Sequence, residues 1–120
     1  MLNNWTGMGR FTKDPELRTT QNGKPVVTFT IAVDRDYDRE TADFFTCVAW
    51  NQKAEFINNH YKKGQLAVVN GAFQSRAWKD RDGNNRVSWE VNVVNIYFAE
   101  KKAQTADVAV EELGEEELPF

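Results

Sequence analysis

The 120-residue sequence has little of the residues on which covalent and metal chemistry depend. It contains one cysteine, Cys47, and one histidine, His60. A single cysteine excludes an intrachain disulfide and is typical of a reducing compartment, and the two residues together cannot supply a zinc site of the usual ligand types. No apolar run reaches the length of a membrane span, and no basic stretch precedes an apolar one at the N-terminus. We therefore expect a cytoplasmic protein.

Motifs of catalysis and ion binding are also missing. Asp34-x-Asp36-x-Asp38 begins like a calcium loop, but Arg39 stands at the required glycine and Phe45 at the closing glutamate. There is no phosphate-binding glycine loop and no nucleophile elbow. The sequence therefore predicts a protein that is not an enzyme and that holds no cofactor and no metal.

The net charge of −3 combines two segments of opposite sign. Residues 1–102 carry all 15 Lys and Arg against 12 Asp and Glu, which leaves this part mildly basic. Residues 103–120 carry six acidic residues and no basic one. Low hydrophobicity with charge of one sign predicts a disordered tail from residue 101 onward.

Strand patterns dominate the first hundred residues. Asn22-Gly23 favours a tight hairpin turn between the first two strands, and the second of them places Val27, Phe29, Ile31 and Val33 on one face. Further strands are predicted over residues 44–50, 66–78 and 87–98.

One segment changes period. Ala54, Ile57 and Tyr61 recur at helical spacing, with Asn51 as the expected N-cap and Gly64 as the expected C-cap. The order is then three strands, one helix and two strands. This order predicts an all-β fold with one helix, the five-stranded Greek-key barrel called the OB-fold (β-β-β-α-β-β). A small β-sandwich or an SH3-like barrel is the alternative.

Strand alternation puts large aromatic rings on two faces. Phe44 and Trp50 share one face of the strand over 44–50, opposite Phe45, while Trp78 shares a face with Arg76. A small barrel has only one interior, so one set of rings must lie outside or under another subunit. Exposed rings beside basic residues are typical of proteins that stack the bases of a single strand.

Several stretches closely resemble the bacterial and phage single-stranded DNA-binding proteins: residues 9–18, 28–33, 42–44 and 62–64, and the acidic Pro-Phe ending over 115–120. The resemblance implies an OB barrel, usually a homotetramer although a dimer is possible. It places the four base-stacking aromatics on Tyr37, Phe44, Trp50 and Trp78. Our candidate phosphate contacts are Arg10, Lys13, Arg18, Arg35, Lys53, Arg76, Lys79 and Arg86.

The same resemblance implies a function and a domain plan. We expect sequence-nonspecific binding and protection of single-stranded DNA during replication, recombination and repair, in the cytoplasm and associated with the nucleoid. Residues 1–100 would form the DNA-binding domain, 101–114 a short flexible linker and 115–120 an acidic tip. The tip would recruit replication, recombination and repair proteins through Glu115, Glu116, Glu117, Leu118, Pro119 and Phe120.

Two departures and two alternatives accompany this prediction. The loop over 34–43 carries five carboxylates, which predicts a smaller DNA footprint or weaker wrapping. The family's first strand usually runs apolar and often contributes to subunit pairing, but here it reads Trp5-Thr6-Gly7-Met8. This departure leaves the oligomeric state open between a tetramer and a dimer. The alternatives are an OB protein for single-stranded RNA and a replication-restart accessory that acts mainly through its tail.

Overall fold

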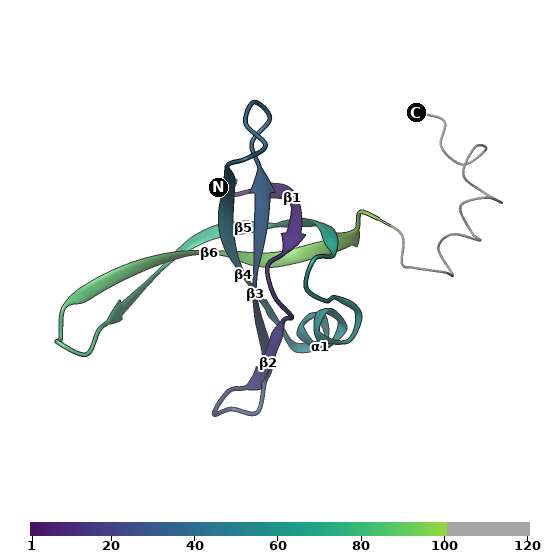
Figure 1. Ribbon diagram of the computed structural model, residues 1–120. Helices are drawn as coiled ribbons and strands as arrows, with labels where there is room; N and C mark the ends of the chain where they lie inside the picture. The colour runs from purple at the N-terminus through teal and green to yellow at the C-terminus, as the bar shows by residue number, and fades with distance from the viewer. Residues whose placement is uncertain (101–120) are drawn as a thin grey trace.

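The computed structural model describes residues 1–100, so the predicted linker over 101–114 and the predicted tip over 115–120 lie outside the described residues. Six strands and one helix follow in the order β1 (Trp5–Phe11), β2 (Glu16–Thr19), β3 (Pro25–Asp34), β4 (Ala42–Trp50), α1 (Asn51–His60), β5 (Leu66–Lys79) and β6 (Asn85–Phe98) (Figure 1). Within residues 1–100, no helix has the length and apolar character that crossing a membrane requires.

The strands close into one barrel. Their order is β1-β5-β6-β4-β3-β2, and a further pairing of β1 with β3 joins the two ends of the sheet. All neighbours are antiparallel except β4 and β6, which pair in parallel through Cys47 with Val91 and Val48 with Asn92. This closed Greek-key arrangement, with its helix between β4 and β5, confirms the predicted OB-fold.

The first predicted strand is divided in two. β1 pairs with β5 and crosses β3 at Arg10–Ala32, whereas β2 pairs with β3. Pro15, just before β2, has no amide hydrogen to donate to a ladder, so the strand breaks there. The crossing is close, because a Cβ on Gly9 would lie 2.4 Å from the Ala32 carbonyl oxygen. The five predicted strands therefore appear as six segments.

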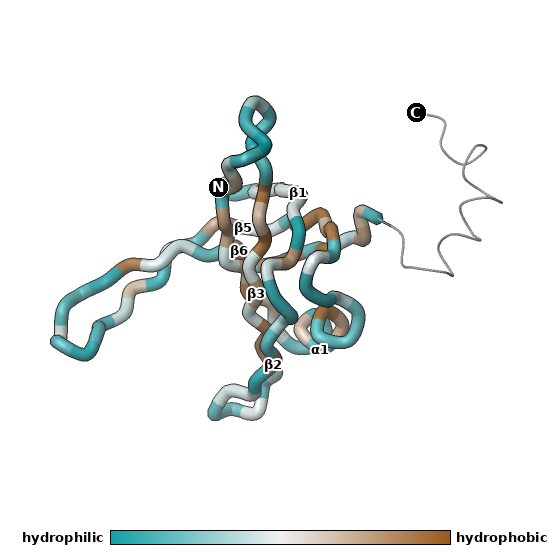
Figure 2. Tube along the Cα trace, viewed as in Figure 1, coloured by the Kyte–Doolittle hydropathy of each residue, from teal (hydrophilic) through white to brown (hydrophobic). Residues whose placement is uncertain are grey.

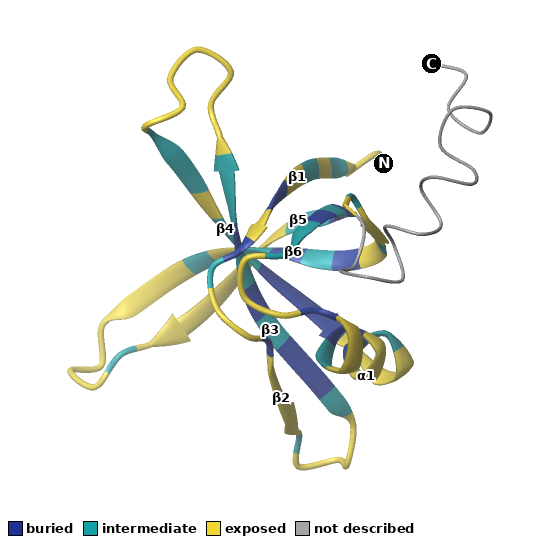
Figure 3. Cartoon of the chain, turned by 45° about the vertical axis from the view of Figure 1, so that its right-hand side comes forward, coloured by how far each residue is buried: buried dark blue, intermediate teal, exposed yellow. Residues whose placement is uncertain are grey.

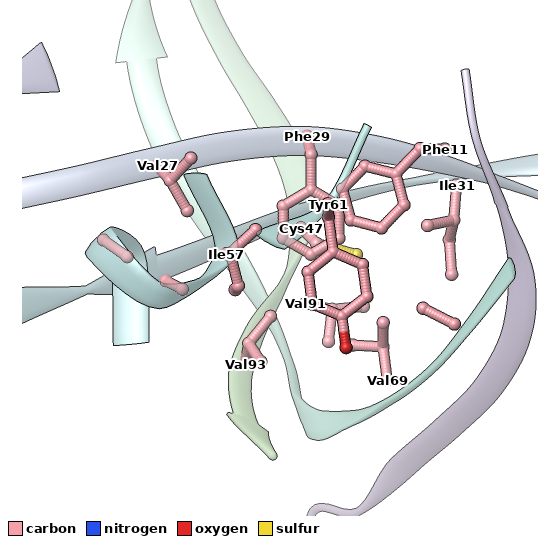
Figure 4. Close-up of a cluster of buried hydrophobic side chains, with 13 residues drawn as sticks. Phe11, Val27, Phe29, Ile31, Cys47, Ile57, Tyr61, Val69, Val91 and Val93 are labelled. Atoms are coloured by element: carbon pink, nitrogen blue, oxygen red, sulfur yellow. The ribbon is translucent and has the colours of Figure 1, made fainter. Parts of the chain in front are cut away.

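Aromatic rings fill the centre of the barrel. Phe11 stacks on Phe29 with centroids 4.6 Å apart and on Tyr61 at 5.2 Å, and Ile57 of α1 closes the same cluster (Figure 4). The predicted inner face of β3 is confirmed, since Val27 and Phe29 are fully buried. Burying such rings contributes the dominant stabilising free energy of a domain of this size.

The ends of α1 differ from the prediction. Trp50 occupies the N-cap position without a side-chain hydrogen bond, and Asn51 adopts a left-handed φ of 60° as the first helical residue. The helix ends at His60, and the C-cap residue Tyr61 is extended. Gly64 therefore lies in the following turn, where its N–H donates to the Phe11 carbonyl oxygen at 2.8 Å. The predicted caps are wrong because the chain turns sharply at Asn51, a residue type that tolerates positive φ.

The β5–β6 hairpin is longer than the barrel. Residues 74–90, which we call the arm, extend away from the other strands (Figures 1 and 3). Most of the arm is exposed, and it is mainly hydrophilic with isolated hydrophobic positions (Figure 2). The arm therefore offers two solvent-facing surfaces on one pair of strands.

Candidate nucleic-acid interface

The outer side of β4 carries exposed aromatic residues. Phe45, Cys47 and Ala49 point into the barrel, and the alternate positions point outward, as the sequence pattern predicts. Phe44 is 66% exposed and Trp50 43%, although both belong to a strand in the middle of the sheet. We call this outer side, together with the same side of the arm, the front face.

Trp50 lies beside the arm. It lines a groove of about 260 Å³ with Gln74 and Arg76 of β5 and with Glu90 of β6. Gln74, Arg76 and Trp78 occupy every second position of β5, so Trp78 lies on the same side of the arm as the other two. The front face is therefore continuous from Phe44 through Trp50 to Trp78.

Trp78 is fixed in orientation. It is 41% exposed, and its indole N–H donates to the Ser88 hydroxyl at 2.7 Å across the hairpin. This bond lies between neighbouring rows, since Trp78 pairs with Arg86 and Ser88 pairs with Arg76. The ring is held across the arm rather than free to rotate, so it would lose little entropy on binding a flat ligand.

Tyr37 stands apart from the strands. It is 99% exposed in the loop between β3 and β4. Asp38 organises this loop, since its carboxylate accepts bonds from the Thr41 hydroxyl at 2.6 Å and the Glu40 amide at 3.0 Å. These hydrogen bonds hold the pKa of Asp38 below its usual value. The loop thus presents Tyr37 to solvent.

Two arginines on the arm are paired with carboxylates. Arg76 contacts Glu90 at 3.2 Å on the front face, and Arg86 contacts Asp80 at 2.9 Å. The amide of Asn84 and the guanidinium of Arg86 hold the pKa of Asp80 below its usual value. Exposed ion pairs of this kind stabilise little, so a phosphate can compete with the carboxylate for either arginine.

Arg10 and Arg35 lie in a different place. Together with Arg39 they line a hollow beside Gly9 and Ala32, at the crossing of β1 over β3. Arg10 contacts Glu100 at 3.0 Å, while Arg35 grips Asp43 with two bonds of 2.9 and 3.0 Å.

Arg35 donates hydrogen bonds to Asp43, and these bonds hold the pKa of the Asp43 carboxyl below its usual range. Arg39 was not among the residues predicted to contact phosphate, because five carboxylates give the loop over 34–43 an acidic composition. The alternation of acidic and basic residues along that loop was the available signal.

The remaining four basic candidates are spread over the barrel and the turn of the hairpin. Lys13 contacts Glu16 at 3.5 Å. Arg18, Lys53 and Lys79 form no ion pair within residues 1–100. Arg18 pairs with Val26, which in turn pairs with Trp50, so it lies in the same cross-strand row as a front-face ring. The structure thus brings some of the eight basic candidates to the front face and leaves Arg10 and Arg35 in the hollow.

A separate apolar patch covers the outer side of β1, β5 and β6. Met8 pairs with Val68 and Val68 with Tyr97, and both Met8 and Tyr97 are more than half exposed. Beside this row, Asn70 donates to the Asn4 side-chain oxygen at 2.8 Å. We call this surface the Met8 face. Met8 also lines the hollow that holds Arg10, Arg35 and Arg39, so the Met8 face adjoins that basic hollow.

The single cysteine and the single histidine both take part in packing. Cys47 is buried, and burial raises the pKa of its thiol to about 12, which keeps it protonated. His60 stacks on Phe56 with centroids 4.4 Å apart. Nowhere in the described part of the chain do three or more His, Cys, Asp or Glu gather as metal ligands.

Comparison with known proteins adds independent evidence. The chain matches the model of the Single-strand binding protein family over residues 2–99. It is 43% identical over 106 residues to the single-stranded DNA-binding protein A of Bacillus subtilis strain 168. The matched region covers 85% of this chain and 62% of that protein.

Two further relatives agree. The chain is 41% identical to the single-stranded DNA-binding protein of Halalkalibacterium halodurans, over 85% of its own length and 63% of the relative's. It is 40% identical to the single-stranded DNA-binding protein 2 of Listeria monocytogenes, over 91% of its own length and 71% of the relative's. It thus spans less than two thirds of the first two relatives. The extent of the family match and these identities show that the chain belongs to the single-strand binding protein family.

Proposed function

We propose that this protein binds single-stranded DNA without sequence preference, through its front face. The observation that carries the proposal is the exposure of Phe44, Trp50 and Trp78 on one continuous surface, with Tyr37 on the adjoining loop. Large rings are rarely left exposed together on a soluble domain unless they bind something. The names of the relatives, which are single-stranded DNA-binding proteins, support the same ligand.

Base stacking supplies the sequence tolerance. Every base has an aromatic face, so a ring binds adenine, guanine, cytosine or thymine alike. Each stacked base contributes about 1–3 kcal/mol, a range established for single-strand-binding OB-folds in general. Trp50 in its groove and the fixed indole of Trp78 are the rings best placed to hold successive bases.

Phosphate contacts complete the binding. Arg76 and Arg86 flank Trp78 and would exchange their carboxylate partners for phosphate oxygens, while Arg18, Lys53 and Lys79 have no carboxylate to exchange within residues 1–100. We assign the same role to Arg10, Lys13 and Arg35. Since each phosphate contact releases a condensed counterion, affinity should fall as salt rises.

The test is a titration of the full chain with a polythymidine oligonucleotide, followed by tryptophan fluorescence at two salt concentrations. Saturable quenching that weakens at the higher salt supports the proposal, because only Trp50 and Trp78 of the four tryptophans lie on the front face. The control is a matched titration with Trp50→Ala/Trp78→Ala, which should bind more weakly and lose the quenching that arises on the front face. Absence of quenching for the unaltered chain at low salt would refute the function.

We also propose that the protein assembles with copies of itself, as a homotetramer or a dimer. The Met8 face supports this, since a contiguous apolar sheet surface is typical of a subunit contact. The experiment is sedimentation of the full chain and of Met8→Lys/Tyr97→Lys. A smaller species for the variant is expected, and a monomeric unaltered chain would contradict the assembly.

The wider role belongs to the same proposal. The protein would protect single strands during replication, recombination and repair in the cytoplasm, on nucleoid DNA, with residues 101–114 as linker and 115–120 as the tip that recruits partners. The tip joins the apolar side chains of Leu118 and Phe120 to three glutamates, which suits a pocket with an apolar floor and a basic rim. A flexible linker of this length reaches only about 20 Å.

The acidic tail should also compete with DNA for the basic surface. Deleting residues 111–120 is then expected to tighten binding at low salt and to change little at high salt, because charge competition is screened. Equal affinity of the two chains at low salt would refute this competition and leave recruitment as the tail's proposed task.

A further inference from the structure

The arm carries a second aromatic surface on the side opposite the front face. Strand alternation puts Trp89 and Val87 of β6 on that side, across from Ser75 and Ala77 of β5. Trp89 is 56% exposed and Val87 61%, because their partners are small and no third strand borders them. We call this surface the reverse face and define it by Ser75, Ala77, Lys79, Val87 and Trp89.

Trp89 is supported on one side and open on the other. Phe73 stacks on it with centroids 5.2 Å apart and planes 27° from parallel, and Phe73 itself packs against the barrel core. More than half of the Trp89 side chain nevertheless stays exposed. A ring braced from behind has little rotational freedom left to lose, so it is prepared for a flat aromatic ligand.

The charges on the reverse face favour a polyanion. Lys79 is its only charged residue, and it forms no ion pair within residues 1–100. Two of the three carboxylates of the arm are paired, Glu90 with Arg76 on the front face and Asp80 with Arg86, and the third, Asp82, lies in the turn of the hairpin. An open ring beside an uncompensated cation matches a base next to its phosphate.

We propose that the reverse face is a second stacking site for single-stranded DNA, with Trp89 against a base and Lys79 near the adjacent phosphate. Trp78 lies on the opposite side of the same two β-strands, so a DNA chain that passes around the edge of the arm meets both rings. The inference rests on the proposed function, because it extends the path of the same ligand from the front face to the reverse face.

The first test compares equilibrium affinities of full-length variants for long polythymidine. Trp89→Thr should bind about 5- to 150-fold more weakly, the range that the loss of one stacked base produces. Trp89→Phe keeps a ring and should stay within a few-fold of the unaltered chain. Val87→Thr, the matched comparison, removes apolar surface from the same face but keeps the Trp89 ring, so it should lose much less affinity than Trp89→Thr.

The outcomes separate the two proposals. If Trp78→Thr weakens binding and Trp89→Thr does not, the reverse face is not a DNA site and the front face stands. If the unaltered chain binds no single-stranded DNA, the proposed function itself fails. An equal loss in Trp89→Phe and Trp89→Thr, or a loss that accompanies a change of oligomeric state in sedimentation, assigns the effect to something other than stacking and overturns the inference.

Photocross-linking provides a direct measurement that does not depend on a variant folding. Polythymidine carrying 5-iododeoxyuridine is irradiated with the full chain, and the tryptic peptides are identified by mass spectrometry. Trypsin places Trp78 in residues 77–79 and Trp89 in residues 87–101, and fragmentation of the second peptide separates Trp89 from Tyr97 of the Met8 face. Cross-links on both peptides are expected, whereas cross-links on 77–79 without any on 87–101 would overturn the inference.

Discussion

The two halves of the β5–β6 hairpin share one ladder but have opposite environments. In the barrel half, β1 borders β5 and β4 borders β6, and Val69 and Val91 are completely buried. In the arm half, residues 74–90, the two strands pair with each other and expose Val87 and Trp89. Valine occurs in both halves, so the bordering strands rather than the residue type decide burial. The barrel half supplies stability and the arm half supplies accessible side chains.

The largest effect that would sharpen this comparison is on the free energy of unfolding. Phe29→Ala removes a ring that stacks on Phe11 inside the barrel and should cost about 3–5 kcal/mol. Val87→Ala in the arm should change stability by less than about 0.5 kcal/mol. Urea unfolding at one protein concentration measures both, and similar losses would mean that the arm is packed in solution.

The junction between the halves should be nearly as sensitive. A Cβ on Gly71 would lie 2.2 Å from the Asn92 carbonyl oxygen, at the position where the β5–β6 register shifts. Gly71→Ala therefore forces two backbones apart and should destabilise the protein by about 1–3 kcal/mol. Ser75→Ala, a short distance into the arm, is the control for thermal unfolding and should have almost no effect. An unchanged melting temperature for Gly71→Ala would show that the junction is not tightly packed.

In the arm, a substitution should affect binding instead of stability. Trp78→Ala is expected to weaken binding to polythymidine by about 1–3 kcal/mol while changing the free energy of unfolding by less than about 1 kcal/mol. Ser88→Ala removes the hydroxyl that holds the Trp78 indole and should cause a smaller loss of affinity. Fluorescence anisotropy and urea unfolding of the same samples decide the matter. A stability loss that matches the affinity loss would make Trp78 part of the folded core.

The smallest expected effect concerns the ion pair on the arm. Glu90→Gln frees Arg76 from its partner and should tighten DNA binding by about two- to five-fold at low salt, with the gain lost at high salt. Glu55→Gln changes the net charge equally on exposed helix α1 and should change affinity less. Identical gains for both variants would attribute the effect to net charge alone.

Local alternation was sufficient to predict much of the fold and of the front face. Phe44 and Trp50 are six positions apart on one strand, so the period of two predicts that they share a face, and the structure shows that this face points outward. The closed barrel and the helix after β4 likewise follow from the order of the patterns. The role of these rings in stacking stays a prediction.

Other features depend on pairs that are distant in the sequence. Arg10 contacts Glu100, 90 residues away, and Arg76 meets Glu90 only because the hairpin register brings them together. A list of basic residues read from the sequence cannot distinguish paired from unpaired cations. Pro15 and Asn51 are different, because residue type alone indicated a strand break and a sharp turn that the predicted elements overlooked.

The parallel seam between β4 and β6 bears on how fast the chain folds. Its paired residues, Cys47 with Val91 and Val48 with Asn92, are separated by 44 positions, whereas the β3–β4 and β5–β6 ladders are hairpins closed by short loops. Forming a contact between distant residues costs chain entropy before any side chain is buried. The hairpins should therefore form first, and zipping of this short seam, together with the β1–β5 pairing, should set a folding time in the millisecond-to-second range.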